Sequence, residues 1–331
     1  MTRRPLSGRL RAWHLVAGTA LLAVLAAGSL FVGVSDLTPA GLLAGRPEEV
    51  RTLVESRLPR LLAILLAGTA MSVAGLVMMH LTGNRFVSPS TAGTTESATF
   101  GVLVATLFAG GEAVIVKMVT AVAFALLGTF FFMAILRRLT FRDMILVPLA
   151  GIMFGGVVGA ATTFVAYRAD LLQSLGAWTA GDFSGVLRGR YELLWIAGAV
   201  TVLGYLYADR FTVAGLGRGF AVNLGVRYDR VVNTGLVLAA AITAVVVVTV
   251  GEVPFVSLIV PNLVTLALGD NLRHALPATA LTGALFVLLC DIAGRIIRFP
   301  YEIPVSTVLG VVGAAAFLAL LLGGGKRMGL R

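Results

Sequence analysis

Charged side chains are scarce in this sequence. Asp, Glu, Lys and Arg make up 13% of its 331 residues, whereas a soluble domain usually carries about 25%. Hydrophobic residues make up 58%. Because water cannot solvate so many apolar side chains, the shortage of charge excludes an ordinary soluble domain and indicates a protein that lies in lipid.

Motifs for phosphate, metal or nucleophilic chemistry are also missing. The only Gly-Lys pair, Gly325-Lys326, is followed by Arg327, so no G-x-x-x-x-G-K-[ST] loop is present. Cys290 is the one cysteine, which excludes a disulfide within the chain, and the three histidines lie far apart in sequence. No H-E-x-x-H motif and no Ser, His and Asp set stands out. We therefore expect no ATPase site, no protein-held metal and no bound cofactor, and an intramembrane enzyme is disfavoured.

Long apolar runs take the place of those motifs. A membrane-spanning helix needs about 20 mostly apolar residues, and Leu, Ala and Gly-rich runs favour helices over the short alternating segments of a barrel. The first run is longer than the core of a signal peptide, so we expect it to be retained. We predict an all-α, polytopic membrane protein with about ten transmembrane helices in a single domain, residues 1–331. The ten runs cover residues 13–34, 58–81, 92–109, 113–136, 144–165, 193–207, 231–250, 253–268, 276–294 and 303–322.

Basic residues predict the orientation. Ten spans place both termini on one side, and the loops and ends on that side contain 16 of the 26 Lys and Arg residues. The positive-inside rule makes this side cytoplasmic. Basic residues that orient the protein in the membrane also explain the net charge of +10, so nucleic-acid binding is not needed to explain it. We expect a multi-pass protein of the inner membrane with both termini in the cytoplasm.

Two loops are too long to be plain connections. Residues 167–192 form an outer, periplasmic loop, and residues 208–230 form a cytoplasmic loop that mixes apolar side chains with glycines and arginines. Such a mixture at a membrane edge indicates a surface helix or a docking site.

Glu96 is the one candidate for a proton carrier deep in a predicted span. Secondary transporters often carry such groups, so Glu96 keeps a proton-driven transporter open as an alternative. The other explanation, which we favour, is a carboxylate at a helix start that is hydrogen-bonded by Thr94 or Thr95.

Several short motifs follow one another along most of the chain. They are RLPR at 57–60, GNRFVSPSTAGT at 83–94, WTAGDF at 178–183, LGV at 224–226, VPFVSLIVPN at 253–262 and EIPV at 302–305. Their order and spacing resemble the FecCD family, the permease subunits of bacterial importers for iron–siderophores, haem and cobalamin. The amino-acid sequences of the second, fifth and sixth motifs most resemble those of the subgroup that is associated with catechol-type siderophores, such as the anguibactin and petrobactin permeases.

This resemblance implies a type II ABC importer permease fold and a transport function. The chain would move an iron–siderophore chelate across the inner membrane, with a haem or cobalamin permease as the alternative within the family. The implied partners are a second permease subunit, two ATPase subunits that use ATP, and a periplasmic or lipid-anchored substrate-binding protein. We expect the second permease to be a paralogue and not an identical copy.

The resemblance assigns docking of the binding protein to four arginines at outer helix ends. An arginine pairs with a carboxylate through two parallel hydrogen bonds, which suits acidic residues on the binding protein. The alternative is an ordinary helix-end arginine that extends to the membrane interface. The four residues are Arg57, Arg60, Arg295 and Arg298.

ATPase coupling is assigned to the cytoplasmic loop, because its apolar side chains could fill a groove on a partner. A surface helix that lies on lipid without a partner is the alternative. The coupling residues are Phe211, Leu216, Phe220, Leu224, Gly225 and Val226.

Four residues are assigned to the translocation path or its gate: His80, Thr140, Glu96 and Asn262. His80 stands where the family usually has Gln, and Asn262 and Thr265 replace the commoner His and Arg. His80 could line the exit or could equally be a packed polar residue.

Overall fold

The computed structural model describes residues 8–33, 37–108, 114–138 and 146–324. Across these ranges the chain forms helices and no strand, which confirms the predicted all-α fold. The helices are α1 (Gly8–Leu30), α2 (Pro39–Leu43), α3 (Pro47–Thr52), the π-helical turn η1 (Leu53–Arg57), α4 (Leu58–Thr82), α5 (Thr94–Phe108), α6 (Val114–Arg138), α7 (Leu146–Arg168), α8 (Leu172–Thr179), η2 (Tyr191–Leu193), α9 (Leu194–Leu206), α10 (Ala208–Gly215), α11 (Arg218–Asn223), α12 (Tyr228–Val250), α13 (Val256–Leu268), α14 (Leu272–Ile296) and α15 (Val305–Gly324).

Each of the ten predicted apolar runs contains one of these helices. In the described part of the chain, six helices are long and apolar enough to cross a membrane alone, and α9 with α10, bent by 62°, makes a seventh candidate. By contrast, α5 and α13 have 15 and 13 residues, about 20 Å of helix at 1.5 Å per residue. A hydrocarbon core of about 30 Å is longer than that, so these two helices cover only part of the membrane thickness.

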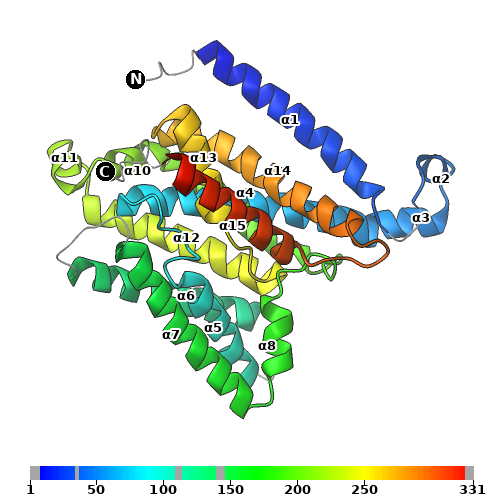
Figure 1. Cartoon of the computed structure of the whole chain (residues 1–331), viewed down its shortest axis with the longest axis horizontal. Coiled ribbons are helices and arrows are strands. Elements are labelled where there is room, and N and C mark those ends of the chain that lie inside the picture. Colours follow the sequence, from blue (N-terminus) through cyan, green and yellow to red (C-terminus); the bar gives the residue numbers. More distant parts are fainter. Residues whose placement is uncertain (1–7, 34–36, 109–113, 139–145, 325–331) are drawn as a thin grey trace.

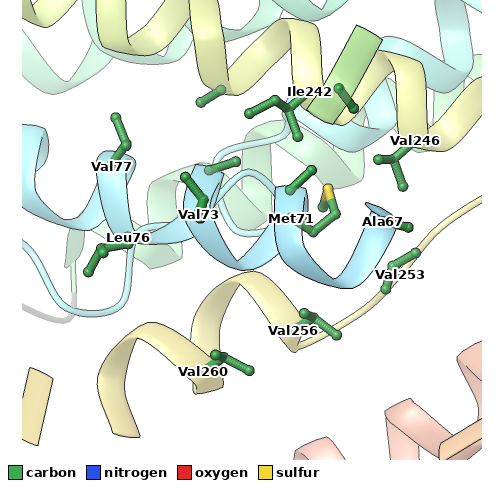
Figure 2. Packing of buried hydrophobic residues seen from close by; sticks show 14 of the residues in the cluster. Ala67, Met71, Val73, Leu76, Val77, Ile242, Val246, Val253, Val256 and Val260 are labelled. Atoms are coloured by element: carbon green, nitrogen blue, oxygen red, sulfur yellow. The ribbon is translucent and has the colours of Figure 1, made fainter. Parts of the chain in front are cut away.

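Helix α4 is the centre of the bundle, and its residues are mostly buried. It lies between α12 on one side and α13 with α14 on the other (Figure 1). Figure 2 shows Met71 and Val73 of α4 facing Ile242 and Val246 of α12, while Val256 of α13 lies on the opposite side of α4. The core of the protein is therefore built around one fully surrounded helix.

Small residues allow this close packing. A Cβ atom at Gly75 of α4 would overlap the carbonyl oxygen of Ser257 in α13, and one at Gly68 would lie 2.7 Å from the carbonyl oxygen of Gly283 in α14. In lipid, helices associate through such close van der Waals contact, because a hydrophobic driving force between them is missing. These glycines thus set the distances from α4 to α13 and α14.

The two long loops contain short helices. The outer loop holds α8 and η2, and the loop at 208–230 holds α10 and α11. The first described turn of α1, the end of α15 and the α10–α11 segment lie at the same end of the bundle, opposite α2 and α3 (Figure 1). An ion pair between Arg273 at the start of α14 and Asp209 in α10 joins α14 to this end.

Candidate functional site

Three of the four arginines predicted to dock a binding protein are buried. Arg57, Arg60 and Arg295 are 7%, 6% and 3% exposed, whereas Arg298 is exposed and lies over the ring of Tyr301. In this structure the guanidinium groups of these three are therefore not accessible to a partner. Docking itself stays a prediction, and Arg298 is the member of the set with an accessible side chain.

Two of the buried arginines share the carboxylate of Asp291, and Arg60 also pairs with Glu302. Arg60 donates through Nε and Nη2 to Oδ1 of Asp291 at 3.0 and 2.8 Å, and through Nη1 to Oε2 of Glu302 at 2.6 Å. Arg295 pairs with the other oxygen of Asp291. Asp291 is fully buried, so its charge is tolerable only because two guanidinium groups surround it.

Backbone carbonyl groups complete this cluster, which we call the arginine clamp: Arg57, Arg60, Arg295, Asp291 and Glu302. Nη1 of Arg295 donates to the carbonyl oxygens of Ser29 and Val32, both at 2.9 Å, and Nη1 of Arg57 donates to that of Val32 at 2.8 Å. The clamp ties the end of α1 to the start of α4, the end of α14 and the connection before α15. Its geometry indicates that it holds four segments together at one end of the bundle.

Sequence reasoning missed the two acids of the clamp. Asp291 lies in an apolar run and has Arg295 four residues further on, the spacing that brings two side chains together on one helix face. That spacing could have identified the pair within α14. No local signal connects Arg60 to Asp291, because the two are 231 residues apart.

The predicted coupling residues divide into an exposed and a buried group. Leu216, Phe220 and Leu224 are 60%, 68% and 63% exposed. Phe211 is fully buried and packs beside Tyr207, with ring centroids 6.1 Å apart. Because Phe211 faces the core, its side chain offers no surface to a partner in this structure, and its coupling role stays a prediction.

The backbone around α11 is shaped by two glycines. Gly217 and Gly225 have φ angles of 100° and 76°, a left-handed region that favours glycine. Val226 is half-buried and packs against the core. The loop therefore returns to the bundle at Val226 and leaves Phe220 and Leu224 exposed. We call Leu216, Phe220 and Leu224 together the α11 apolar surface.

A cavity of about 660 Å³ lies behind this loop. It is bounded by the end of α4, the end of α6, the start of α12 and the turn between α10 and α11, and His80 lines it. The ring nitrogens of His80 lie 3.0 Å from the carbonyl oxygen of Leu76 and 2.9 Å from that of Asp270. His80 is therefore both a packed, hydrogen-bonded residue and part of a cavity wall.

Asn262 is buried and bridges two segments. Its side-chain nitrogen donates to the carbonyl oxygens of Arg85 at 2.7 Å and Leu258 at 2.8 Å. These bonds fasten the loop before α5 to α13, so the side-chain nitrogen of Asn262 is engaged inside the protein. Thr140, the fourth residue assigned to the path, lies outside the described residues.

Glu96 lies in the first turn of α5 and is half-buried beside Gly155 of α7. The hydrogen bond expected from Thr94 or Thr95 is not formed: Thr94 pairs with Thr129 at 2.8 Å, and within the part of the chain that the structure describes the hydroxyl of Thr95 is buried without a hydrogen-bond partner. Among the described residues, Oε2 of Glu96 is buried without a hydrogen-bond partner. Glu252 lies in the connection between α12 and α13, close enough to Glu96 for the two carboxylates to interact. Burial of the Glu252 side chain is the main cause that raises its pKa to about 7, and the nearby charge of Glu96 is the second.

Comparisons with known proteins agree with this architecture. The model of the FecCD transport family matches residues 20–323. A solved metal-chelate type ABC transporter in an inward-facing conformation has the same fold, with a TM-score of 0.81 over 94% of this chain and 99% of that chain at 24% identity.

Two curated relatives match nearly the whole chain. The petrobactin import system permease protein YclN of Bacillus subtilis is 49% identical over 91% of this chain and 96% of its own length. The ferric-anguibactin transport system permease protein FatD of Vibrio anguillarum is 40% identical over the same shares. The chain is therefore a multi-pass membrane permease and belongs to the FecCD transport family.

Proposed function

We propose that this chain is the permease subunit of an ATP-binding-cassette importer that carries an iron–siderophore chelate of the petrobactin or anguibactin class across the inner membrane. Relatives that are 49% and 40% identical over nearly their full lengths carry those substrates in their names. The order of motifs from 57 to 305 supports the same assignment.

One structural observation supports the ATP-driven mechanism most directly, the α11 apolar surface. Leu216, Phe220 and Leu224 are at least 60% exposed at the end of the bundle where α1 begins. The chain has no phosphate loop, so energy from ATP would enter through a contact with another protein. A short helix with exposed apolar side chains suits a groove on an ATPase subunit.

The proposed assembly contains two permease subunits, two ATPase subunits and a substrate-binding protein that is periplasmic or lipid-anchored. The second permease is a paralogue in this proposal. Both termini and the α11 apolar surface face the cytoplasm, since the loops and ends on this side carry 16 of the 26 basic residues. The arginine clamp and Arg298 then lie at the periplasmic end.

The test is uptake in cells that lack their own petrobactin permease. The chain is expressed with its paralogue, ATPase and binding protein, and cells receive radioiron-loaded petrobactin, anguibactin or a hydroxamate siderophore. We expect uptake of one of the first two and no uptake when the ATPase carries an inactivating substitution in its own phosphate loop. Uptake that continues with the inactive ATPase would contradict the proposal and would favour a proton-driven carrier that uses Glu96.

A cobalamin permease is the second candidate. Vitamin B12 permeases of Vibrio cholerae and Shigella sonnei are 32% and 31% identical to this chain, and they share its fold family. The same cells therefore also receive labelled cobalamin and haem. Uptake of either one, without uptake of an iron–siderophore, would replace the proposed substrate class while leaving the permease assignment intact.

A further inference from the structure

A second cavity lies between α1 and the bundle, away from the 660 Å³ cavity. It has a volume of about 400 Å³ and is bounded by α1, the start of α14, the end of α9 and the end of α13. Sites for small ligands typically have volumes of about 300–1,000 Å³. We call this cavity the α1–α14 cleft.

The cleft exists because α1 packs loosely along α14. Trp13, Val16 and Val24 are 63–69% exposed, so much of the helix faces away from the protein. Contact is close where a Cβ atom at Gly18 would lie 2.7 Å from Leu281, and the clamp holds the far end of α1 through the carbonyl oxygen of Ser29. The cleft opens between Gly18 and the first turns of both helices, and α1 diverges from the bundle there (Figure 1).

Aliphatic side chains and polar or basic groups both line the cleft. His14, Tyr205, Arg273 and His274 lie near the ends of α1, α9 and α14, which we call the mouth of the cleft, and Leu15 and Leu268 lie beside them. Pro277, Leu281 and Leu285 lie further along α14. Arg273 is in the first turn of the apolar helix α14, and His14 follows the first residue of the apolar part of α1, which runs from Trp13 to Leu30. Both side chains therefore lie where a spanning helix meets lipid headgroups.

Charge at the mouth favours an anion. Among the described residues, Arg273 donates through Nη1 to the carboxylate of Asp209 at 2.6 Å. A guanidinium group has five N–H donors, so donors remain for a second acceptor. The α14 N-terminus adds a partial positive charge at the same place.

We propose that the α1–α14 cleft binds one anionic phospholipid. Its phosphate accepts hydrogen bonds from Arg273 and from His14 and His274, and one acyl chain lies against Leu281 and Leu285. The ligand fits both halves of the cleft, because a phospholipid joins an anionic headgroup to an aliphatic chain in one molecule. Basic pockets between transmembrane helices on the cytoplasmic side are typical sites for such headgroups. This inference does not depend on which chelate the protein transports.

Retention of lipid by the full-length chain tests the proposal. The protein is purified from nanodiscs of phosphatidylcholine with one-fifth phosphatidylglycerol, and bound lipid is identified by native mass spectrometry. We expect Arg273→Gln to reduce bound phosphatidylglycerol about tenfold relative to the unchanged protein, since a charge-assisted hydrogen bond is worth at least the 1.4 kcal/mol that corresponds to a factor of ten. Ala278→Phe, which fills the cleft without changing charge, should cause a similar loss.

Two control variants separate lipid binding from other roles of Arg273. Asp209→Asn removes the same ion pair but keeps the guanidinium group, so it should retain the lipid; an equal loss would assign Arg273 a merely structural role and overturn the proposal. Arg46→Gln alters another exposed arginine that is paired with a carboxylate, Glu49, at the opposite end of the bundle, and it should bind lipid normally.

Three further results would overturn the proposal. One is equal retention of phosphatidylcholine and phosphatidylglycerol, which would indicate ordinary boundary lipid. Another is unchanged retention in both Arg273→Gln and Ala278→Phe. The third is full displacement of the lipid by millimolar inorganic phosphate, which would show that the site recognises a free anion. The melting temperature of each variant in pure phosphatidylcholine shows that it is folded.

Discussion

Loss of the carboxylate at the centre of the arginine clamp should destabilise the protein strongly. Asp291→Asn keeps the side-chain shape but removes the charge that Arg60 and Arg295 share. Removal of one partner from a buried ion pair typically costs about 3–5 kcal/mol, because the remaining charge stays buried without compensation. Glu302 still neutralises Arg60, whereas Arg295 keeps only carbonyl oxygens. We therefore expect about 3 kcal/mol.

The assay is thermal unfolding of the purified chain in detergent, followed by size-exclusion chromatography with fluorescence detection. At an unfolding entropy of about 2.1 cal/mol/K per residue, one kcal/mol changes the melting temperature of a chain of 331 residues by about 1.4 °C. Asp291→Asn should therefore melt about 4 °C lower.

The matched control for this experiment is Asp209→Asn. It breaks an ion pair with an N–O distance of 2.6 Å whose side chains are 62% and 65% exposed. Exposed pairs contribute about 0–1 kcal/mol, so this variant should melt within about 2 °C of the unchanged protein. Equal shifts in the two variants, or no shift in Asp291→Asn, would refute the reasoning that burial makes the clamp essential.

Three further predictions concern partners and pH. Arg298→Glu should weaken binding of the substrate-binding protein, measured by surface plasmon resonance, at unchanged melting temperature, since its side chain is exposed; normal binding would remove it from the docking set. Leu224→Asp should abolish co-purification of the ATPase and substrate-stimulated hydrolysis, because a carboxylate cannot enter an apolar contact unpaired. Leu43→Asp, on a leucine that is 92% exposed at the opposite end, should leave both intact, and equal losses would contradict a specific contact. The pKa of Glu252 is raised from 4.5 to about 7, so its stabilising effect is complete below pH 4.5 and is lost as pH rises through 7. The melting temperature of Glu252→Gln should therefore exceed that of the unchanged protein above pH 7, and the difference should vanish near pH 4.5; a difference independent of pH would refute this assignment.

Much of the fold could be predicted from local sequence properties. The ten apolar runs each contain a helix, because the length of an apolar run and the requirement for internal backbone hydrogen bonds leave a chain in lipid few alternatives. The exposed position of Leu224 and the turn at Gly225 also agree with the expected surface loop.

The environment of individual polar residues could not be predicted in this way. The four outer arginines look alike in sequence, yet Arg298 is exposed while Arg60 is buried against Asp291 and Glu302. Phe211 and Phe220 lie in the same predicted loop, yet Phe211 in α10 is buried against the core and Phe220 in α11 is exposed.

The sequence by itself determined that this is a helical membrane permease, where its apolar helices lie along the chain and which family it belongs to. Those properties depend on composition and on motifs that are read along the chain. The tertiary structure alone decided that three arginines form a clamp, that α1 leaves a cleft beside α14, and that Glu96 and Glu252 interact. Each of these depends on which helices lie side by side, and contacts between residues far apart in the chain leave no periodic signal in the sequence.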